Sequence, residues 1–242
     1  NAFYLGENER KQISNLLNEN KSNTIFLYAP GLIDRKTGIN LKNVEELSGF
    51  KLRMDSNIQK NHLNARVKIN SKSLPFSDIN DHIFGPTKYL YAQGEFLLSP
   101  VLSIVDEDAE VIGNYVSSSN IAIAKKQLTG RNSYFITVPI VSDELWRAIA
   151  KDSGLHLYIE DNQKVFLDAS SRFLSFHATD KGYQGEIYLP RENSLYDVFN
   201  KQNIIKNSKQ FTLNLQQFES KLFFLGNNAE IKELESAFQM NR

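Results

Sequence analysis

The chain has no cysteine among its 242 residues, only one tryptophan and two methionines, and no excess of charge of either sign. Without cysteine it forms no disulfide, offers no thiolate to a metal and contains no cysteine nucleophile. Its 28 basic residues are balanced by 28 acidic ones, whereas nucleic-acid-binding and membrane-surface proteins carry a basic excess. We therefore expect no nucleic-acid partner and no membrane partner.

Long apolar runs are absent as well. The longest, residues 24–29 and 96–105, fall well short of the roughly 20 residues that span a bilayer. The chain begins with Asn1 rather than methionine, and residues 1–5 read like the end of a strand. We expect the chain to be part of a longer polypeptide, so the lack of a signal peptide carries no weight.

The common cofactor and hydrolase motifs are also missing. The sequence has no G-x-x-x-x-G-K-[ST] loop, no G-x-G-x-x-G and no G-x-S-x-G elbow, the patterns of nucleotide-binding proteins and serine hydrolases. Its four histidines, His62, His82, His156 and His177, lack the short spacings that place two imidazoles on one metal ion. The sequence thus predicts no cofactor, no metal site and no catalytic triad.

The first two thirds of the chain alternate between helical and strand-like patterns. Residues 7–20 have helical periodicity, and the unbroken apolar run 24–29 follows them. A run without alternation is typical of a strand that is buried on both faces of a parallel sheet. Further helices are expected over residues 42–48, before Gly49, and 142–151. Short strands are expected at residues 65–69, 89–92, 102–105, 110–115, 121–125, 134–138 and 155–159.

Beyond residue 160 the pattern changes. Apolar and polar residues alternate in short runs about ten residues apart, which is typical of a small antiparallel β-sandwich. The runs are residues 164–168, 173–177, 186–189, 195–199, 210–215 and 221–225. We predict an α/β domain over residues 1–159, a β-sandwich over 160–227, and a C-terminal helix and tail over 228–242.

Acidic residues follow two of the expected strands, where α/β proteins place ligand-binding groups. Asp34 comes after the run 24–29, although Pro30 and Gly31 also make this an ordinary exit from a sheet. Asp106 and Asp108 follow the expected strand 102–105. Because a glycosidase needs two carboxylates facing each other across roughly 5–10 Å, neighbouring acids in one loop do not suffice. Asp108 reads mainly as a turn former or cap.

Three further residues are candidates for ligand contact. Trp146, on the expected helix 142–151, suits a sugar face or an interface, and equally a core-facing anchor. His156 and Tyr158 lie in the expected strand 155–159, where a packing or interdomain role is the favoured interpretation of His156. With Asp34, these residues make up the predicted binding set.

Several of these segments, taken in order, resemble one family. The likeness is to the C-terminal region of bacterial β-galactosidase-type glycoside hydrolases. There, a class I glutamine-amidotransferase-like domain of the trimerisation type precedes a small β-sandwich. The resemblance covers most of the chain except residues 53–95, and is carried by residues 1–5, 25–31, 43–52, 109–115, 146–158, 173–177, 185–190 and 195–198.

The resemblance implies a flavodoxin-like parallel sheet with flanking helices, followed by an all-β sandwich. In that family the sugar chemistry belongs to an upstream (β/α)₈ barrel, and no eightfold βα pattern occurs here. The resemblance therefore implies a non-catalytic chain that assists subunit assembly and supports the barrel. Its implied partners are that upstream barrel, further copies of the chain and carbohydrate. Polysaccharide breakdown favours a periplasmic or extracellular location, which the sequence itself does not specify.

Two alternatives stay open. The chain could be a carbohydrate-binding module that holds sugar near Asp34, Trp146 and Tyr158 without cleaving it. It could instead be a free-standing glycosidase that uses Asp106 or Asp108 together with a distant acid.

Overall fold

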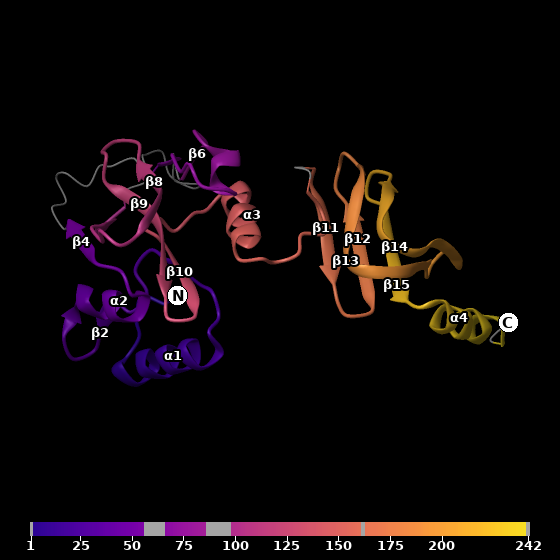
Figure 1. The fold of residues 1–242 in the computed structure, drawn as a ribbon, viewed down its shortest axis with the longest axis horizontal. Helices are drawn as coiled ribbons and strands as arrows, with labels where there is room; N and C mark the ends of the chain where they lie inside the picture. The colour runs from indigo at the N-terminus through magenta and orange to yellow at the C-terminus, as the bar shows by residue number, and fades with distance from the viewer. Residues whose placement is uncertain (1, 56–65, 86–97, 161–162, 241–242) are drawn as a thin grey trace. The chain divides into compact units, whose positions relative to one another are not determined.

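The computed structural model describes residues 2–55, 66–85, 98–160 and 163–240. The chain divides into two compact units, Asn1–Leu155 and His156–Arg242 (Figure 1). Each unit has a hydrophobic core of its own. His62 and the strand expected at residues 89–92 lie outside the described residues, as does the first residue of the expected strand 65–69.

Unit 1 combines a large sheet, a small sheet and three described α-helices. The helices are α1 (Glu7–Asn20), α2 (Leu41–Ser48) and α3 (Asp143–Asp152), with a 3₁₀ turn η1 (Phe76–Ile79). The strands are β1 (Thr24–Leu27), β2 (Ile33–Asp34), β3 (Gly38–Ile39), β4 (Leu52–Asp55), β5 (Val67–Ile69), β6 (Ile83–Phe84), β7 (Val101–Ile104), β8 (Glu110–Tyr115), β9 (Ile121–Leu128) and β10 (Arg131–Ile136).

The large sheet is mixed rather than parallel, so the flavodoxin-like prediction is wrong. Its strand order is β1-β10-β9-β8-β5-β6, and β7 pairs with both β9 and β4. Of the strand pairs in the described residues, only β1 and β10 run parallel. The reason is local: β9 and β10 are joined by two residues, of which Gly130 has a φ of 80°. A tight hairpin joins antiparallel strands, whereas parallel ones need a long crossover.

The run 24–29 that suggested a buried parallel strand has another explanation. Among the described residues its strand, β1, pairs only with β10 and so lies at the sheet edge. The side chain of Leu27 is 38% exposed. The chain turns away at Tyr28, whose φ is 60°, and Tyr28 and Ala29 are buried in the core beyond the strand. The apolar run therefore continues because the loop that follows the strand is buried in the core, not because the strand is covered on both faces.

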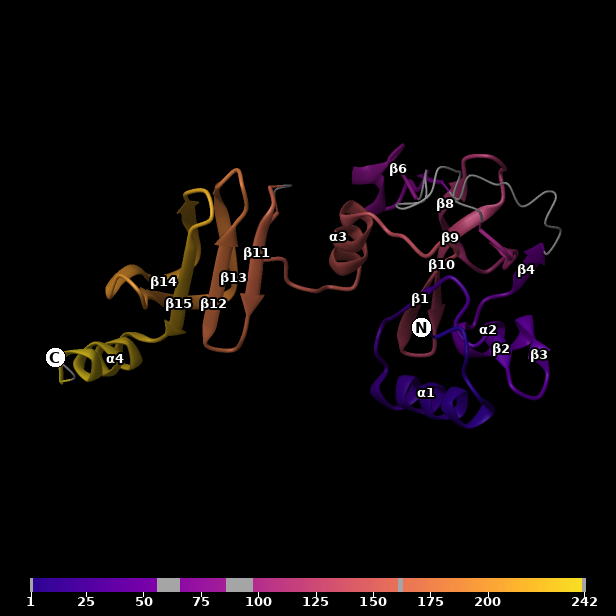
Figure 2. The ribbon, with the colours of Figure 1, turned by 180° about the vertical axis from the view of Figure 1, so that it is seen from behind.

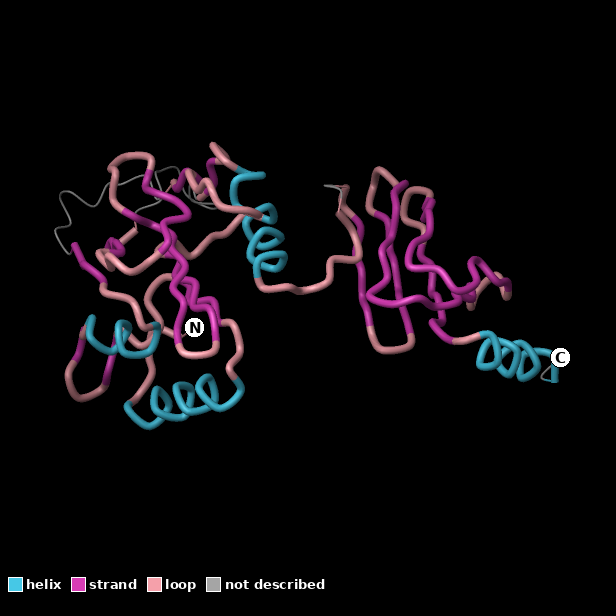
Figure 3. The backbone as a smooth tube through the Cα atoms, viewed as in Figure 1, coloured by secondary structure: helices cyan, strands magenta, loops and turns pink. Residues whose placement is uncertain are grey.

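The helices of unit 1 cover the sheet through narrow apolar stripes. α2 buries Val44 and Leu47, one helical turn apart, and ends at Gly49, whose φ is 83°. α3 begins at the cap Ser142, whose side chain accepts a hydrogen bond from the Leu145 amide. α1 has no fully buried side chain and packs against α2. Figures 2 and 3 show α1 and α2 at one end of the unit, beside β2 and β3.

Unit 2 is built on one antiparallel sheet with the order β11-β12-β15-β13-β14. The strands are β11 (Val165–Ala169), β12 (Phe173–Ala178), β13 (Tyr183–Asp197), β14 (Gln202–Leu215) and β15 (Ser220–Gly226). The runs expected at 186–189 and 195–199 fall mainly in one long strand, β13, whose register shifts mark bulges. The strand expected at 155–159 is reduced to a single bridge between Ile159 and Ile187.

Helix α4 (Asn228–Met240) follows β15 and packs on it through Ile231. It begins where the sequence predicts, because Asn227 accepts hydrogen bonds from the Ala229 and Glu230 amides. Among the described residues, no helix is both long enough and apolar enough to cross a membrane.

Candidate functional site

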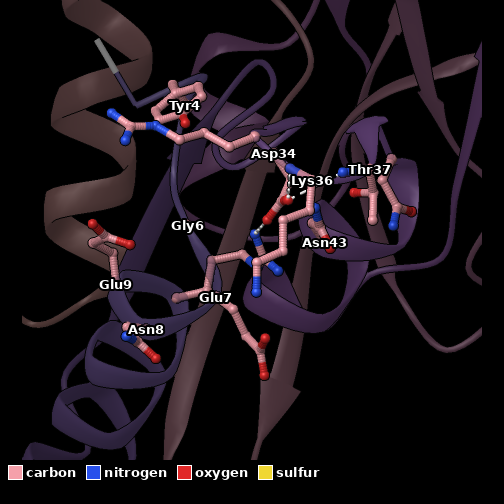
Figure 4. A pocket seen from close by; sticks show the side chains of 12 residues that line it. Tyr4, Gly6, Glu7, Asn8, Glu9, Asp34, Lys36, Thr37 and Asn43 are labelled. Carbon is pink, nitrogen blue, oxygen red and sulfur yellow. Dashed lines mark hydrogen bonds and ion pairs between the residues drawn. The ribbon is translucent and has the colours of Figure 1, made fainter.

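Unit 1 contains a pocket of about 430 Å³. It lies where the N-terminal ends of α1 and α2 meet the β2–β3 hairpin, and twelve residues line it (Figure 4). Pockets that bind small molecules have volumes of about 300–1,000 Å³. Asp34, which the sequence marked as a ligand contact, is one of the lining residues. Trp146, His156 and Tyr158 are not.

The Asp34 side chain connects the turn of the β2–β3 hairpin to helix α1 at one side of the pocket. Its Oδ1 accepts hydrogen bonds from the amides of Lys36, at 2.7 Å, and Thr37, at 3.3 Å. This is the local turn that aspartate favours. Its Oδ2 pairs with Arg10 Nη1 at 3.0 Å. The Lys36 amide and the Arg10 guanidinium together lower the pKa of the Asp34 carboxyl.

Arg10 connects α1 to this turn. It lies in the first part of α1, is mostly buried, and also donates from Nη1 to the Leu5 carbonyl at 2.7 Å. One guanidinium nitrogen thus ties the segment before α1 to the hairpin. Arg10 therefore positions Asp34 and leaves this carboxylate with both oxygens occupied.

Two helix N-termini face the pocket. Gly6, which precedes α1, provides no side-chain cap, and Glu7, Asn8 and Glu9 of the first turn line the pocket with it. The first amides of a helix have no partner within the helix and carry a partial positive charge. α2 begins after Asn40, whose side chain accepts a hydrogen bond from the Lys42 amide at 3.1 Å.

Asn43, in the first turn of α2, is the least expected lining residue. It is only 5% exposed, and its Nδ2 has no hydrogen-bond partner within the part of the chain that the structure describes. Buried polar atoms in native proteins are nearly always hydrogen-bonded. Figure 4 shows Asn43 on the same side of the pocket as Asp34 and Lys36. The pocket therefore contains a buried donor with unused capacity.

Asp106 lies outside this pocket and is tightly bound. Its side chain is fully buried and accepts from Lys126 Nζ at 2.7 Å and from the Lys51 amide at 3.0 Å. The Asp108 amide donates to its other oxygen at 3.2 Å. Burial alone would raise the pKa of Asp106, but these three donors outweigh burial and lower it. Asp108 itself is exposed and contributes this backbone contact.

The other predicted residues are not brought together with Asp34. Trp146 is an exposed residue of α3. His156 and Tyr158 belong to unit 2, where their rings meet edge to face at 4.8 Å. His156 Nε2 also lies 2.9 Å from the Tyr188 carbonyl. The predicted set is therefore divided between the two units, with only Asp34 in the pocket.

A serine, a histidine and a glutamate meet at the start of α3. His82 Nε2 lies 3.1 Å from Ser142 Oγ and 3.4 Å from Glu144 Oε2. A hydrolase triad uses one imidazole nitrogen for the serine and the other for the acid. Here both contacts fall on the same nitrogen, so the cluster is a helix-capping arrangement and not a triad.

Sequence reasoning missed most of the pocket. Arg10, Lys36 and Asn43 belong to no motif, and they meet only because the hairpin folds back onto the ends of two helices. One local signal was present. Asn40 reads as a helix cap, and a cap places the residue three positions later, Asn43, in the first helical turn.

No protein-family model matches the chain, and no curated protein is similar to it in sequence. The solved structures that share its fold include two β-galactosidases. One is the β-galactosidase from Bacillus circulans sp. alkalophilus, at 11% identity and a TM-score of 0.58, covering 93% of this chain and 32% of that chain. The other is the β-galactosidase from the Antarctic haloarchaeon Halorubrum lacusprofundi, at 11% identity and a TM-score of 0.52, covering 93% of this chain and 30% of that chain. The chain thus has a β-galactosidase-related fold and spans about a third of those enzymes.

Proposed function

We propose that the chain is an accessory, non-catalytic part of a β-galactosidase-like glycoside hydrolase. In this proposal a catalytic barrel lies upstream in a longer polypeptide, and the present residues support it and assist subunit assembly. The observation that carries the proposal is the extent of the fold similarity. It covers 93% of this chain, and so includes both units, but only about a third of each enzyme.

The environments of two acidic side chains support the same proposal. A glycosidase protonates the leaving oxygen with a carboxylic acid whose pKa is raised towards neutrality. The pKa of Asp34 and that of Asp106 are shifted the other way, by hydrogen-bond donors that hold the ionised form. The oxygens that a substrate would need are already bonded to Arg10, Lys126 and backbone amides. Both carboxylates are therefore suited to holding strands and helices together.

The assembly part of the proposal concerns the outer face of the β2–β3 hairpin. Ile33 and Ile39 are cross-strand partners on this face and are 40% and 62% exposed. Asp34, the neighbour of Ile33, points to the opposite face and into the pocket. An exposed apolar pair on a well-anchored hairpin suits contact with a second copy of the chain.

This contact is tested by light scattering on the purified chain over a range of concentrations. We expect the wild type to self-associate, and replacing both Ile33 and Ile39 with serine to shift the molar mass to that of a monomer. The matched control Ile140→Ser removes an isoleucine that is exposed to a similar degree elsewhere in unit 1, and should leave association unchanged. A wild-type chain that stays monomeric at every concentration would remove the assembly role.

A further inference from the structure

We propose that the pocket between the N-terminal ends of α1 and α2 binds the oxyanion group of a small ligand. That group is either an inorganic sulfate or phosphate, or the carboxylate of an acidic sugar. The inference is independent of the proposed accessory role, because it rests on the lining residues alone.

The first argument is the unpartnered amide of Asn43. A buried donor without a hydrogen bond destabilises the folded state, and Asn43 Nδ2 is such a donor on the pocket wall. A ligand oxygen in the pocket would accept its hydrogen bond. Because an amide nitrogen donates and does not accept, the complementary ligand atom is an oxygen with free lone pairs.

The second argument is the first turn of α1. Gly6 supplies no cap, so the amides at this end have no side-chain acceptor from the capping position. Helix N-termini bind sulfate, phosphate and carboxylate through such amides and through the helix dipole. Asn43 is on α2, so donors from two different helices converge on one volume.

The third argument is the balance of charge around the pocket. Arg10 and Asp34 neutralise each other, and Glu7 pairs with Lys11 at 2.6 Å. Arg35 lies over the Tyr4 ring, 5.3 Å from its centroid. Lys36 forms no ion pair in the described part of the chain, although its charge contributes with that of Lys11 to lowering the pKa of Glu7. Lys36 and Arg35 are thus the cations available to a ligand.

One lining acid opposes an anion, and its position limits the effect. The Glu9 side chain folds back onto Gly6, so that a Cβ added to Gly6 would lie only 2.4 Å from Glu9 Oε2. This is the position of the acid in a capping box, in which the helix end compensates the charge. Figure 4 shows Glu9 on the opposite side of the pocket from Asn43. The side formed by Lys36 and Asn43 is therefore the favourable one for an anion.

The test is isothermal titration calorimetry on the full 242-residue chain at low ionic strength, in a buffer without oxyanions. Sodium sulfate, sodium phosphate, sodium galacturonate and neutral galactose are titrated separately. We expect heat of binding with at least one oxyanion and none with galactose. Binding of sulfate or phosphate alone assigns the free ion as the source, and binding of galacturonate alone assigns an acidic sugar.

Variants locate the site. Lys36→Gln removes the charge but retains the amide that bonds to Asp34, and Asn43→Leu removes the unpartnered donor at similar volume. Each should weaken the association constant by about tenfold, as for the loss of one hydrogen bond to a charged group. Lys42→Gln removes a similar charge from the first turn of α2 at an exposed position outside the pocket, and should leave the constant unchanged.

Three results would overturn the proposal. They are no binding of any of the three oxyanions, binding of galactose as tight as that of an oxyanion, and an equal loss of affinity in Lys42→Gln and Lys36→Gln. Folding of each variant is checked by thermal unfolding. Asn43→Leu is expected to unfold at or above the wild-type temperature, because it removes an unbonded buried donor. Lys36→Gln tests the site even if Asn43→Leu does not fold.

Discussion

Replacing Asp106 with alanine is expected to lower the free energy of unfolding of unit 1 by about 3 kcal/mol, as when one partner of a buried ion pair is removed. The carboxylate joins three parts of the chain, namely Lys126 in β9, the Lys51 amide before β4, and the Asp108 amide after β7. Alanine leaves a mostly buried ammonium and an amide without their acceptor.

The measurement is urea denaturation at pH 7, followed by tryptophan fluorescence. Trp146 is the only tryptophan and belongs to α3, so its signal reports on unit 1. Asp106→Asn keeps an acceptor oxygen and should lose less stability than alanine. Asp108→Ala, at the exposed neighbour, should change the free energy of unfolding by less than about 0.5 kcal/mol. Equal losses in Asp106→Ala and Asp108→Ala would contradict the role assigned to Asp106.

The same ion pair has a defined pH dependence. The pKa of Asp106 is lowered in the folded chain, whereas an unfolded aspartate titrates near pH 3.9. Its stabilisation is therefore complete above the unfolded value and is lost as pH falls through the folded one. The difference in unfolding free energy between wild type and Asp106→Asn should be constant at neutral pH and shrink below about pH 4. A difference that grows on acidification would contradict this assignment.

Replacing Phe176 with alanine is expected to destabilise unit 2 by about 4 kcal/mol, as for other buried phenylalanines. Phe176 on β12 is fully buried. Its ring meets that of Phe211 on β14 at 6.4 Å and that of Phe223 on β15 at 6.0 Å. Removing the Phe176 ring would thus leave a cavity where three strands of the sheet share one aromatic cluster.

Hydrogen exchange measured by mass spectrometry separates the two units in this experiment. Peptides from β12 to β15 should lose protection in Phe176→Ala, while those from β8 to β10 and the Trp146 fluorescence transition stay unchanged. Phe166→Ala, at a phenylalanine of β11 that is 65% exposed, serves as the matched control with little effect. A shift of the Trp146 transition in Phe176→Ala would show that the two units do not unfold independently.

The parts of the fold that follow from nearby residues could be predicted from the sequence. α2 lies between the cap Asn40 and Gly49, and α3 begins at Ser142, because caps and terminal glycines act within one helical turn. The alternating runs in β12 and in the last part of β14 form strands because one side of each faces the core. These signals need no knowledge of distant segments.

Sheet topology could not be predicted in the same way. Whether β1 meets a parallel or an antiparallel neighbour depends on β10, which lies far along the chain. An apolar run such as residues 24–29 looks alike in a central strand and in an edge strand that continues into a buried loop. The short link at Gly130 was the available local sign of antiparallel pairing.

The candidate site was predicted only in part for a related reason. Asp34 stood out because it follows a strand, and the structure places it in the pocket. Arg10 is an ordinary helix residue until the hairpin brings Asp34 within 3.0 Å of it. The unused donor of Asn43 is a property of its surroundings and has no counterpart in the sequence.

Hydrolysis of p-nitrophenyl glycosides by the purified 242-residue chain tests the accessory role most directly. We predict that the wild type releases p-nitrophenol no faster than buffer does, with β-galactoside and with other sugars. Asp34→Asn and Asp106→Asn are measured beside it, after circular dichroism has shown that they are folded. Turnover that co-purifies with the chain and disappears in either folded variant would contradict the account.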